Sequence, residues 1–301
     1  MEKTPKLMNY SRMKDLLSPH IAEMREKSFI SNELGMVYGD PSAFLMVLSQ
    51  RQPPFSIDDY RRGVLVHGEI RASINLVERR ITAGTLVFLG PGSILSPISF
   101  SEEIEIYGMA LFSDFPMPFS TGQMPMAFNG QVRDFQILAE EQDLVTARHI
   151  MDTIWHTVHQ QDYNRQTVSS LVAALMHHYD GLYRQHTELL QASQSREQTI
   201  FDRFIYLVNQ YATREHQIGF YADKMCLTQR YLGTVIRQAS GVTAKEWIDR
   251  ALIAHIKIEL KHSDKSIARI SEELNFPNPA FFSKYFKRFT NQPPLKYKQM
   301  K

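Results

Sequence analysis

With 301 residues, 43% of them hydrophobic and 22% charged, the chain has the composition of an ordinary globular protein of about two domains. No apolar run approaches the roughly 20 residues that a membrane span needs, and the first residues lack the pattern of a signal peptide. The single cysteine, Cys226, excludes an internal disulfide and any zinc site built from a cysteine cluster. These features favour a cytoplasmic protein without a membrane partner.

Positive charge is concentrated in the last third of the chain. Residues 196–301 contain 18 Lys and Arg against 10 Asp and Glu, whereas the rest of the chain contains 16 against 22. A basic third on an acidic body indicates a polyanion, such as nucleic acid, as the partner of that third. A chance difference between solvated surfaces explains the same charges, so charge alone leaves both interpretations open.

Residues 1–190 are predicted to form one domain of mixed structure. An amphipathic helix is expected near residues 10–24. From about Ser42 to Phe119, runs rich in Val, Ile, Leu and Phe, the first of them at residues 43–50, alternate with turn residues, which predicts a small β-sandwich or barrel. From about residue 134 to 188 the apolar period becomes helical and predicts a hairpin of two helices.

The helical hairpin is expected to act as a dimerisation arm. In a two-fold dimer its second helix would pack on the partner and bury Leu171, Leu175 and Trp155. The polar residues 191–197 then mark the expected boundary to an all-α domain over residues 196–301.

The C-terminal domain contains two copies of a pattern of short helix, turn and second helix. A helix-period stretch of about 19 residues, near 243–263, joins them and would be roughly 28 Å long. The two units would therefore lie about one DNA turn apart, close to 34 Å, which suits two successive major grooves on one face.

In the first unit, Thr228 is suited to cap the second helix and Gly241 to end it. Ala222 faces inward on the short helix, and Cys226 is predicted to be a small buried residue in the turn. The inward side of the second helix is predicted to hold Leu232, Val235 and Ile236, and the outward side Arg230, Gly233, Thr234 and Arg237.

The second unit repeats this spacing. Ser271 takes the place of the small inward residue, Asn278 is the expected cap, and Pro279 suits the first helical position. Phe281 is open to two interpretations, as a core residue or as a contact to a thymine methyl group. The buried side of the helix is predicted to hold Phe282, Phe286 and Phe289, and the other side Ala280, Lys284, Lys287 and Arg288.

These outward faces suit a major groove, where Arg bonds to guanine and small side chains meet thymine methyl groups. We expect Arg230 and Thr234 to contact bases and Gly233 to allow close approach. Arg237 and Lys287 are expected to hold phosphates, and Lys284 is expected to contact either a base or a phosphate. Ordinary solvated charges are the alternative interpretation of these basic residues.

The stretch from about Arg203 to Lys298 resembles the DNA-binding domain of the AraC/XylS family. The matching pieces are FYADKMCLTQRYL, Ser240–Gly241, the EWI that begins at residue 246, LKHSDKSIARISEELNFPNPAFFSKYFKRFT, and PPLKY. Asn291 stands where the family usually has Gly, and Pro279 where a polar residue is common, which removes a potential base contact. The resemblance implies a sequence-specific, DNA-binding transcription regulator. The alternative is a scaffold or sensor whose domain no longer reads DNA.

The run from Arg71 to Ile98 resembles the cupin-type sensor domain common in this family. This resemblance implies an α+β chain in which a cupin-like β-barrel binds a small-molecule effector and helices after it form a homodimer. RNA polymerase is a further expected partner. A filled barrel that serves only as a dimer scaffold is the alternative. Apolar walls of the effector site are expected at Leu65, Ile74, Leu86 and Phe88.

Enzymatic function finds no support in the sequence. His67 stands alone where enzymatic cupins carry a His-x-His pair, and no nucleophile-elbow, phosphate-loop or dinucleotide pattern occurs. The helix histidines are expected to be solvated or hydrogen-bonded. We therefore expect no catalytic residue, no metal and no cofactor. These histidines are His149, His156, His159, His177 and His178.

Overall fold

The computed structural model describes residues 27–41, 54–57, 59–119, 124–128, 132–193 and 195–299. The helix expected near residues 10–24 and the strand expected at residues 43–50 lie outside these ranges. The chain divides into one compact unit that extends to Leu190 and a second that begins at Gln191. Among the described residues, no helix combines the length and the apolarity that crossing a membrane requires.

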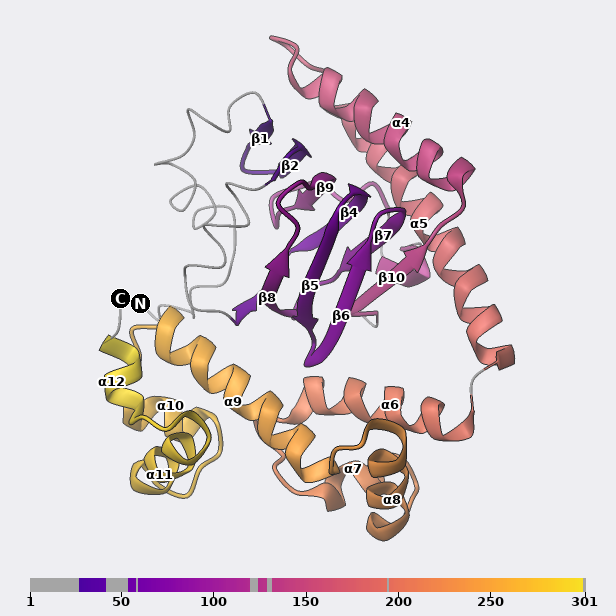
Figure 1. The fold of residues 1–301 in the computed structure, drawn as a ribbon. Coiled ribbons are helices and arrows are strands. Elements are labelled where there is room, and N and C mark those ends of the chain that lie inside the picture. The colour runs from indigo at the N-terminus through magenta and orange to yellow at the C-terminus, as the bar shows by residue number, and fades with distance from the viewer. Residues whose placement is uncertain are drawn as a thin grey trace. The chain divides into compact units, whose positions relative to one another are not determined.

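The first unit contains two antiparallel sheets (Figure 1). One has the strand order β1-β2-β9-β4-β7-β10 and the other β3-β8-β5-β6. Since the described strands of the two sheets do not pair with one another, they form two separate sheets, and the predicted barrel is not closed. The strands are β1 (Ser28–Ile30), β2 (Leu34–Gly39), β3 (Phe55–Ser56), β4 (Tyr60–His67), β5 (Glu69–Ile74), β6 (Val77–Thr82), β7 (Thr85–Leu89), β8 (Ile94–Phe100), β9 (Glu105–Leu111) and β10 (Asp134–Leu138).

Each strand of the six-stranded sheet sends alternate side chains to opposite faces. In β7, Leu86 and Phe88 join a core that contains residues of the following helices, whereas Val87 and Leu89 join the core shared with the four-stranded sheet. Strand β7 is therefore apolar on both faces, which explains why it appears as a nearly continuous apolar run, TLVFL, in the sequence.

Helices α4 (Glu141–Val158) and α5 (Arg165–Ser193) cover one face of the six-stranded sheet (Figure 1). Leu175 is fully buried there within its own chain, so the prediction that it packs on a dimer partner is wrong. Leu171 and Trp155 pack partly buried against the same core. The predicted helical period is confirmed from Glu141 onward and belongs to the core of this unit, whereas residues 134–138, predicted to be helical, form strand β10. A short 3₁₀ helix, η2 (Met126–Phe128), contributes Phe128 to this core.

The second unit is entirely helical in its described part, as predicted (Figure 1). Two pairs of short helix and longer helix, α7–α8 and α10–α11, flank α9, whose 19 residues match the predicted linker helix. The helices are α6 (Arg196–Tyr211), α7 (Ile218–Lys224), α8 (Gln229–Ser240), α9 (Ala244–His262), α10 (Ile267–Glu273), α11 (Pro279–Thr290) and α12 (Pro294–Gln299).

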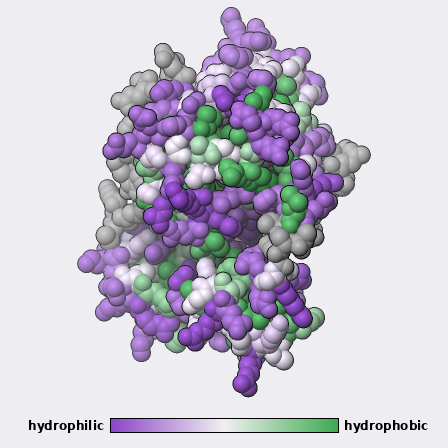
Figure 2. Space-filling model, turned by 45° about the vertical axis from the view of Figure 1, so that its right-hand side comes forward, coloured by the Kyte–Doolittle hydropathy of each residue, from purple (hydrophilic) through white to green (hydrophobic). Residues whose placement is uncertain are grey.

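The surface is mostly polar on the face that Figure 2 shows, with apolar side chains in small patches between charged ones. Scattered apolar residues of this kind are normal on a folded protein. Two exposed apolar residues of the second unit are Phe281, which is 54% exposed, and Leu295, which is 56% exposed.

Candidate nucleic-acid interface

Helix α8 begins and ends where the sequence predicts. The Thr228 hydroxyl accepts a hydrogen bond from the Tyr231 N–H at 3.2 Å, and Gly241 ends the helix with a left-handed φ of 70°. The inward residues Leu232, Val235 and Ile236 are buried. Burial of this stripe against α6 and α9 fixes which side of α8 faces solvent.

The outward face of α8 presents the predicted residues. Arg230, Thr234 and Arg237 are exposed, and Gly233 is half-buried. The Thr234 hydroxyl donates to the Arg230 carbonyl at 3.0 Å, so its proton is already used within the helix. Thr234 therefore offers a partner its methyl group and its oxygen lone pairs, which suits a thymine methyl group or a base amino group.

Gly233 has no packing reason to be glycine. A Cβ added there would meet only the Ile218 Cδ1 atom, at an ordinary 3.8 Å. We therefore expect Gly233→Ala to raise the free energy of unfolding by about 0.5–1 kcal/mol, because alanine favours a helix interior. If Gly233 permits close approach to DNA, the same change should weaken DNA binding. Urea unfolding and fluorescence anisotropy measure the two effects, and unchanged DNA affinity would contradict the role of Gly233.

The turn between α7 and α8 corrects the prediction for Cys226. Its side chain is exposed, and its backbone has a left-handed φ of 55°. Asn275 takes the same conformation in the turn between α10 and α11, with φ of 57°. The turn requires this backbone geometry, and the local geometry rather than the small size of cysteine decides where the side chain points.

Helix α11 also follows its predicted boundaries. The Asn278 side chain accepts from the Phe281 N–H at 2.8 Å, and Pro279 occupies the first turn. Asn291 ends the helix with φ of 57°, so asparagine serves where glycine was the usual residue. Ser271 is buried as predicted, and Phe282 and Phe286 are fully buried.

Phe289 is not a core residue, contrary to its prediction. It is 39% exposed and lies in the last turn of α11, past the apolar cluster around α9. The Arg288 guanidinium lies over its ring at 4.5 Å. Phe281 is exposed and is thus available for an outside contact. The outward residues Ala280, Lys284 and Lys287 are exposed as predicted.

Four basic residues on the outward faces of α8 and α11 have no ion pair with any described residue. Within the ranges that the structure describes, no carboxylate pairs with Arg230, Arg237, Lys284 or Lys287. Several other cations of this unit are paired: Lys245 with Asp249, Arg250 with Glu246, Lys265 with Glu259 and Glu273, and Arg269 with Glu272 and Glu273. Free cations on exposed helix faces are therefore available for phosphates and base edges.

Asp249 connects the linker helix to α11, a role that sequence analysis missed. The Asp249 carboxylate is 5% exposed and accepts from the Tyr285 hydroxyl at 2.7 Å. It also pairs with Lys245 at 2.5 Å, and Arg288 of α11 lies 3.9 Å away. Burial, followed by the hydrogen bond to Asp249, raises the pKa of Tyr285. The only signal in the sequence is an acid directly after the apolar Ile248.

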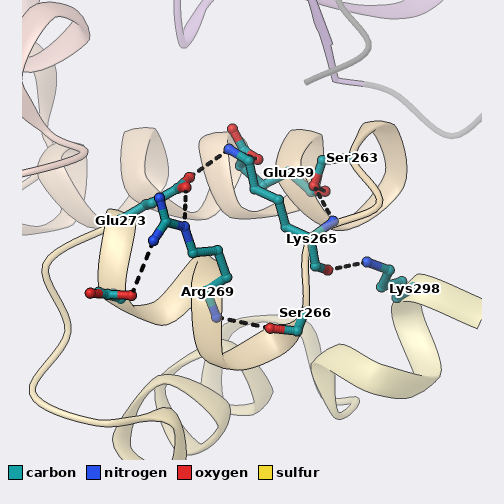
Figure 3. A network of polar contacts seen from close by, with 8 residues as sticks. Glu259, Ser263, Lys265, Ser266, Arg269, Glu273 and Lys298 are labelled. Atoms are coloured by element: carbon teal, nitrogen blue, oxygen red, sulfur yellow. Dashed lines mark hydrogen bonds and ion pairs between the residues drawn. The ribbon is translucent and has the colours of Figure 1, made fainter. Parts of the chain in front are cut away.

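A second polar network fixes the start of α10 (Figure 3). The Lys265 ammonium lies between Glu259, at 3.1 Å, and Glu273, at 2.5 Å, and Arg269 also donates to Glu273. Burial lowers the pKa of Lys265, but its hydrogen bonds to the two carboxylates outweigh this effect and raise it. Lys298 of α12 donates to the Lys265 carbonyl. These contacts tie α10 and α12 to the end of α9.

The four residues predicted for an effector site lie in two different cores. Leu65 and Ile74 belong to the core between the sheets, whereas Leu86 and Phe88 belong to the core under α4 and α5. A cavity of about 110 Å³ lies elsewhere on the six-stranded sheet. It is lined by Ile30, Gly35, Met36, Val37, Arg61, Arg62, Ile106, Gly108, Met109 and Ala110.

No metal site emerges within the described part of the chain. His67 is largely exposed and lies 3.8 Å from Glu103. The described residues include no group of three or more His, Cys, Asp or Glu side chains placed to hold a metal ion.

A family model described as a helix-turn-helix domain matches residues 221–300. The uncharacterized transcriptional regulatory protein YesN of Bacillus subtilis is 29% identical over 79 residues, which are 26% of this chain and 22% of YesN. The HTH-type transcriptional activator RhaR of Escherichia coli is 24% identical over 103 residues, which are 34% of this chain and 36% of RhaR. The similarity thus spans well under half of either relative.

Among solved structures, ToxT from Vibrio cholerae O395 aligns with a TM-score of 0.36 and 15% identity, over 81% of this chain and 89% of ToxT. The C-terminal domain of AraT, a response regulator from Geobacillus stearothermophilus, aligns with a TM-score of 0.34 and 18% identity, over 36% of this chain and 89% of that domain. The family match, the regulator relatives and the two helix-turn-helix units agree. Residues 221–300 are therefore a helix-turn-helix domain of the AraC type, which confirms the family resemblance predicted for the last third of the chain.

Proposed function

We propose that this protein is a sequence-specific, DNA-binding transcription regulator that acts in the cytoplasm. The observation that carries the proposal is the set of unpaired cations on the outward faces of α8 and α11, within an AraC-type domain. Arg230 and Thr234 would contact bases. Arg237 and Lys287 would hold phosphates, Lys284 either, and Ala280 would face the groove as a small apolar residue.

The full chain is expected to bind particular genomic fragments with steep salt dependence. Neutralising the two or three phosphates assigned to Arg237, Lys287 and Lys284 gives a slope of about −1.8 to −2.7 in a plot of log affinity against log salt, because each contact releases counterions. Selection of genomic fragments, followed by anisotropy titrations between low and physiological salt, measures both properties. A chain that prefers no fragment over another would refute the proposal.

The second candidate is a scaffold or sensor whose DNA-binding domain no longer reads DNA. It is favoured by the first turn of α11, where Pro279, Ala280 and Phe281 present no side-chain hydrogen-bond donor. A gel shift with the purified chain separates the candidates, since the scaffold predicts no shifted fragment at any salt concentration.

We further propose that a small-molecule effector binds the first unit and thereby controls the regulator. The cavity on the six-stranded sheet supports this, since a Cβ added at Gly108, which lines it, would meet nothing within 4 Å. An effector must bind one state of the protein more tightly than the other, because equal affinity shifts no equilibrium. A homodimer and contact with RNA polymerase are parts of the same proposal. Light scattering of the chain with and without DNA measures the oligomeric state.

A further inference from the structure

Arg62 of β4 is a buried cation without a hydrogen-bond partner. It is 3% exposed, and its Nε and both Nη atoms find no partner among the residues that the structure describes. The next residue, Arg61, donates from Nε to the Asp59 carboxylate at 2.7 Å. A guanidinium has five N–H donors and a full positive charge. Arg62 therefore carries donors and charge that the described protein leaves uncompensated.

The side chains around Arg62 are apolar and aromatic. Met109 and Phe88 lie opposite it on the neighbouring strands β9 and β7. The ring of Phe128 in η2 lies 5.5 Å from the Arg62 Cζ atom. Burial lowers the pKa of Arg62 to about 10, so the side chain remains protonated at neutral pH. The charge is thus present, in a place that solvates it poorly.

Nearby polar groups are engaged elsewhere. Tyr179 of α5 donates its hydroxyl proton to the Gly63 carbonyl at 3.0 Å. Asp180 accepts from the Ala127 N–H at 2.8 Å and pairs with Arg184 at 2.9 Å. These groups hold α5 and η2 against the sheet and leave the guanidinium to another acceptor.

We propose that Arg62 anchors a binding site for a small carboxylate with an apolar or aromatic body. Buried charges in folded proteins are normally paired, and the planar fork of a guanidinium matches a carboxylate with two parallel hydrogen bonds. The apolar body follows from the surrounding Phe88, Met109 and Phe128. The ligand would take the place of the Phe128 ring beside the guanidinium.

This site differs from the space between the two sheets, because Arg62 alternates along β4 with Leu65 and shares its face with Val64. That face is covered by α5, so a ligand would bear on the helix that leads out of the first unit. Its role as the effector site rests on the proposed function, whereas binding itself does not.

The test is thermal unfolding of the full chain with benzoate and hexanoate, and with benzamide and inorganic phosphate as probes. At about 100 times its dissociation constant, a carboxylate is expected to raise the Tm of its unit by roughly 5–10 °C, whereas benzamide leaves it unchanged. Arg62→Met should abolish the shift while keeping an equal or higher Tm without ligand, because a buried unpaired charge is removed. Arg80→Met removes an exposed arginine paired with Glu69 and should retain the full shift.

The proposal is overturned if neither carboxylate raises the Tm of the unchanged chain, if the shift persists in Arg62→Met, or if phosphate alone acts. Should Arg62→Met fail to fold, Arg62→Lys replaces it and should raise the dissociation constant at least about tenfold, since the bidentate fork is lost. DNA binding is measured on the same samples. A chain that binds benzoate but no DNA would refute the proposed function and leave this site standing.

Discussion

Asp249→Ala is expected to lower the free energy of unfolding of the second unit by about 2–3 kcal/mol. The carboxylate is buried at the junction of α9 and α11, where it accepts from the Tyr285 hydroxyl at 2.7 Å. Without it, a largely buried hydroxyl loses its acceptor and Arg288 loses its nearest carboxylate. The chain has two tryptophans, so Trp155→Phe leaves Trp247 of α9 as the reporter of this unit in urea unfolding.

Tyr285→Phe is the matched control, because it removes the same hydrogen bond and leaves no buried donor behind. It should cost about 1 kcal/mol, and adding it to Asp249→Ala should cost almost nothing more. If the two changes cost the same as the sum of their separate effects, the hydrogen bond is not what Asp249 contributes. Loss of the contact between α9 and α11 should also weaken binding to a DNA site that both helix-turn-helix units contact, since it lets α11 tilt against α9.

The helices of the second unit are predictable because the interactions that begin and end them are local in the sequence. Thr228, Asn278, Gly241 and Asn291 act within a few residues of their own positions, so their capping roles follow directly from the sequence. The helical period likewise fixed the inward side of α8. Phe289 shows the limit, because it has the correct phase but lies beyond the end of the core that its period indicates.

Long-range pairing made the first unit less predictable. Strand β2 pairs with β9 and β7 with β10, and neither partner follows from turn spacing. Apolar alternation therefore predicts strands but not which strands pair with one another. Leu175 was assigned to a dimer interface because a helical stripe does not reveal which surface covers it. The burial of Arg62 and Asp249 does not follow from the sequence, since it depends on residues far apart in the chain.

Arg230→Ala is expected to weaken binding to the cognate DNA site by about 1–3 kcal/mol and to relax preference at one base position. Arg230 is exposed in the first turn of α8, is free of an ion pair with any described carboxylate, and is held in place by a helix capped at both ends. An arginine so placed can donate two hydrogen bonds to a guanine edge, and alanine cannot replace them. Competition binding against a library randomised at each position of the site measures the loss and its location.

Lys287→Ala should behave differently, because a phosphate contact carries no sequence information. It should weaken all fragments by a similar factor and reduce the salt slope by about 1. Arg250→Ala is a matched control, since Arg250 pairs with Glu246 at 2.8 Å on α9 and should leave site preference unchanged. An Arg230→Ala protein with the same preferences as the unchanged chain would contradict base contact by α8. A Lys287→Ala protein that loses preference at a single base would contradict the assignment of Lys287 to a phosphate.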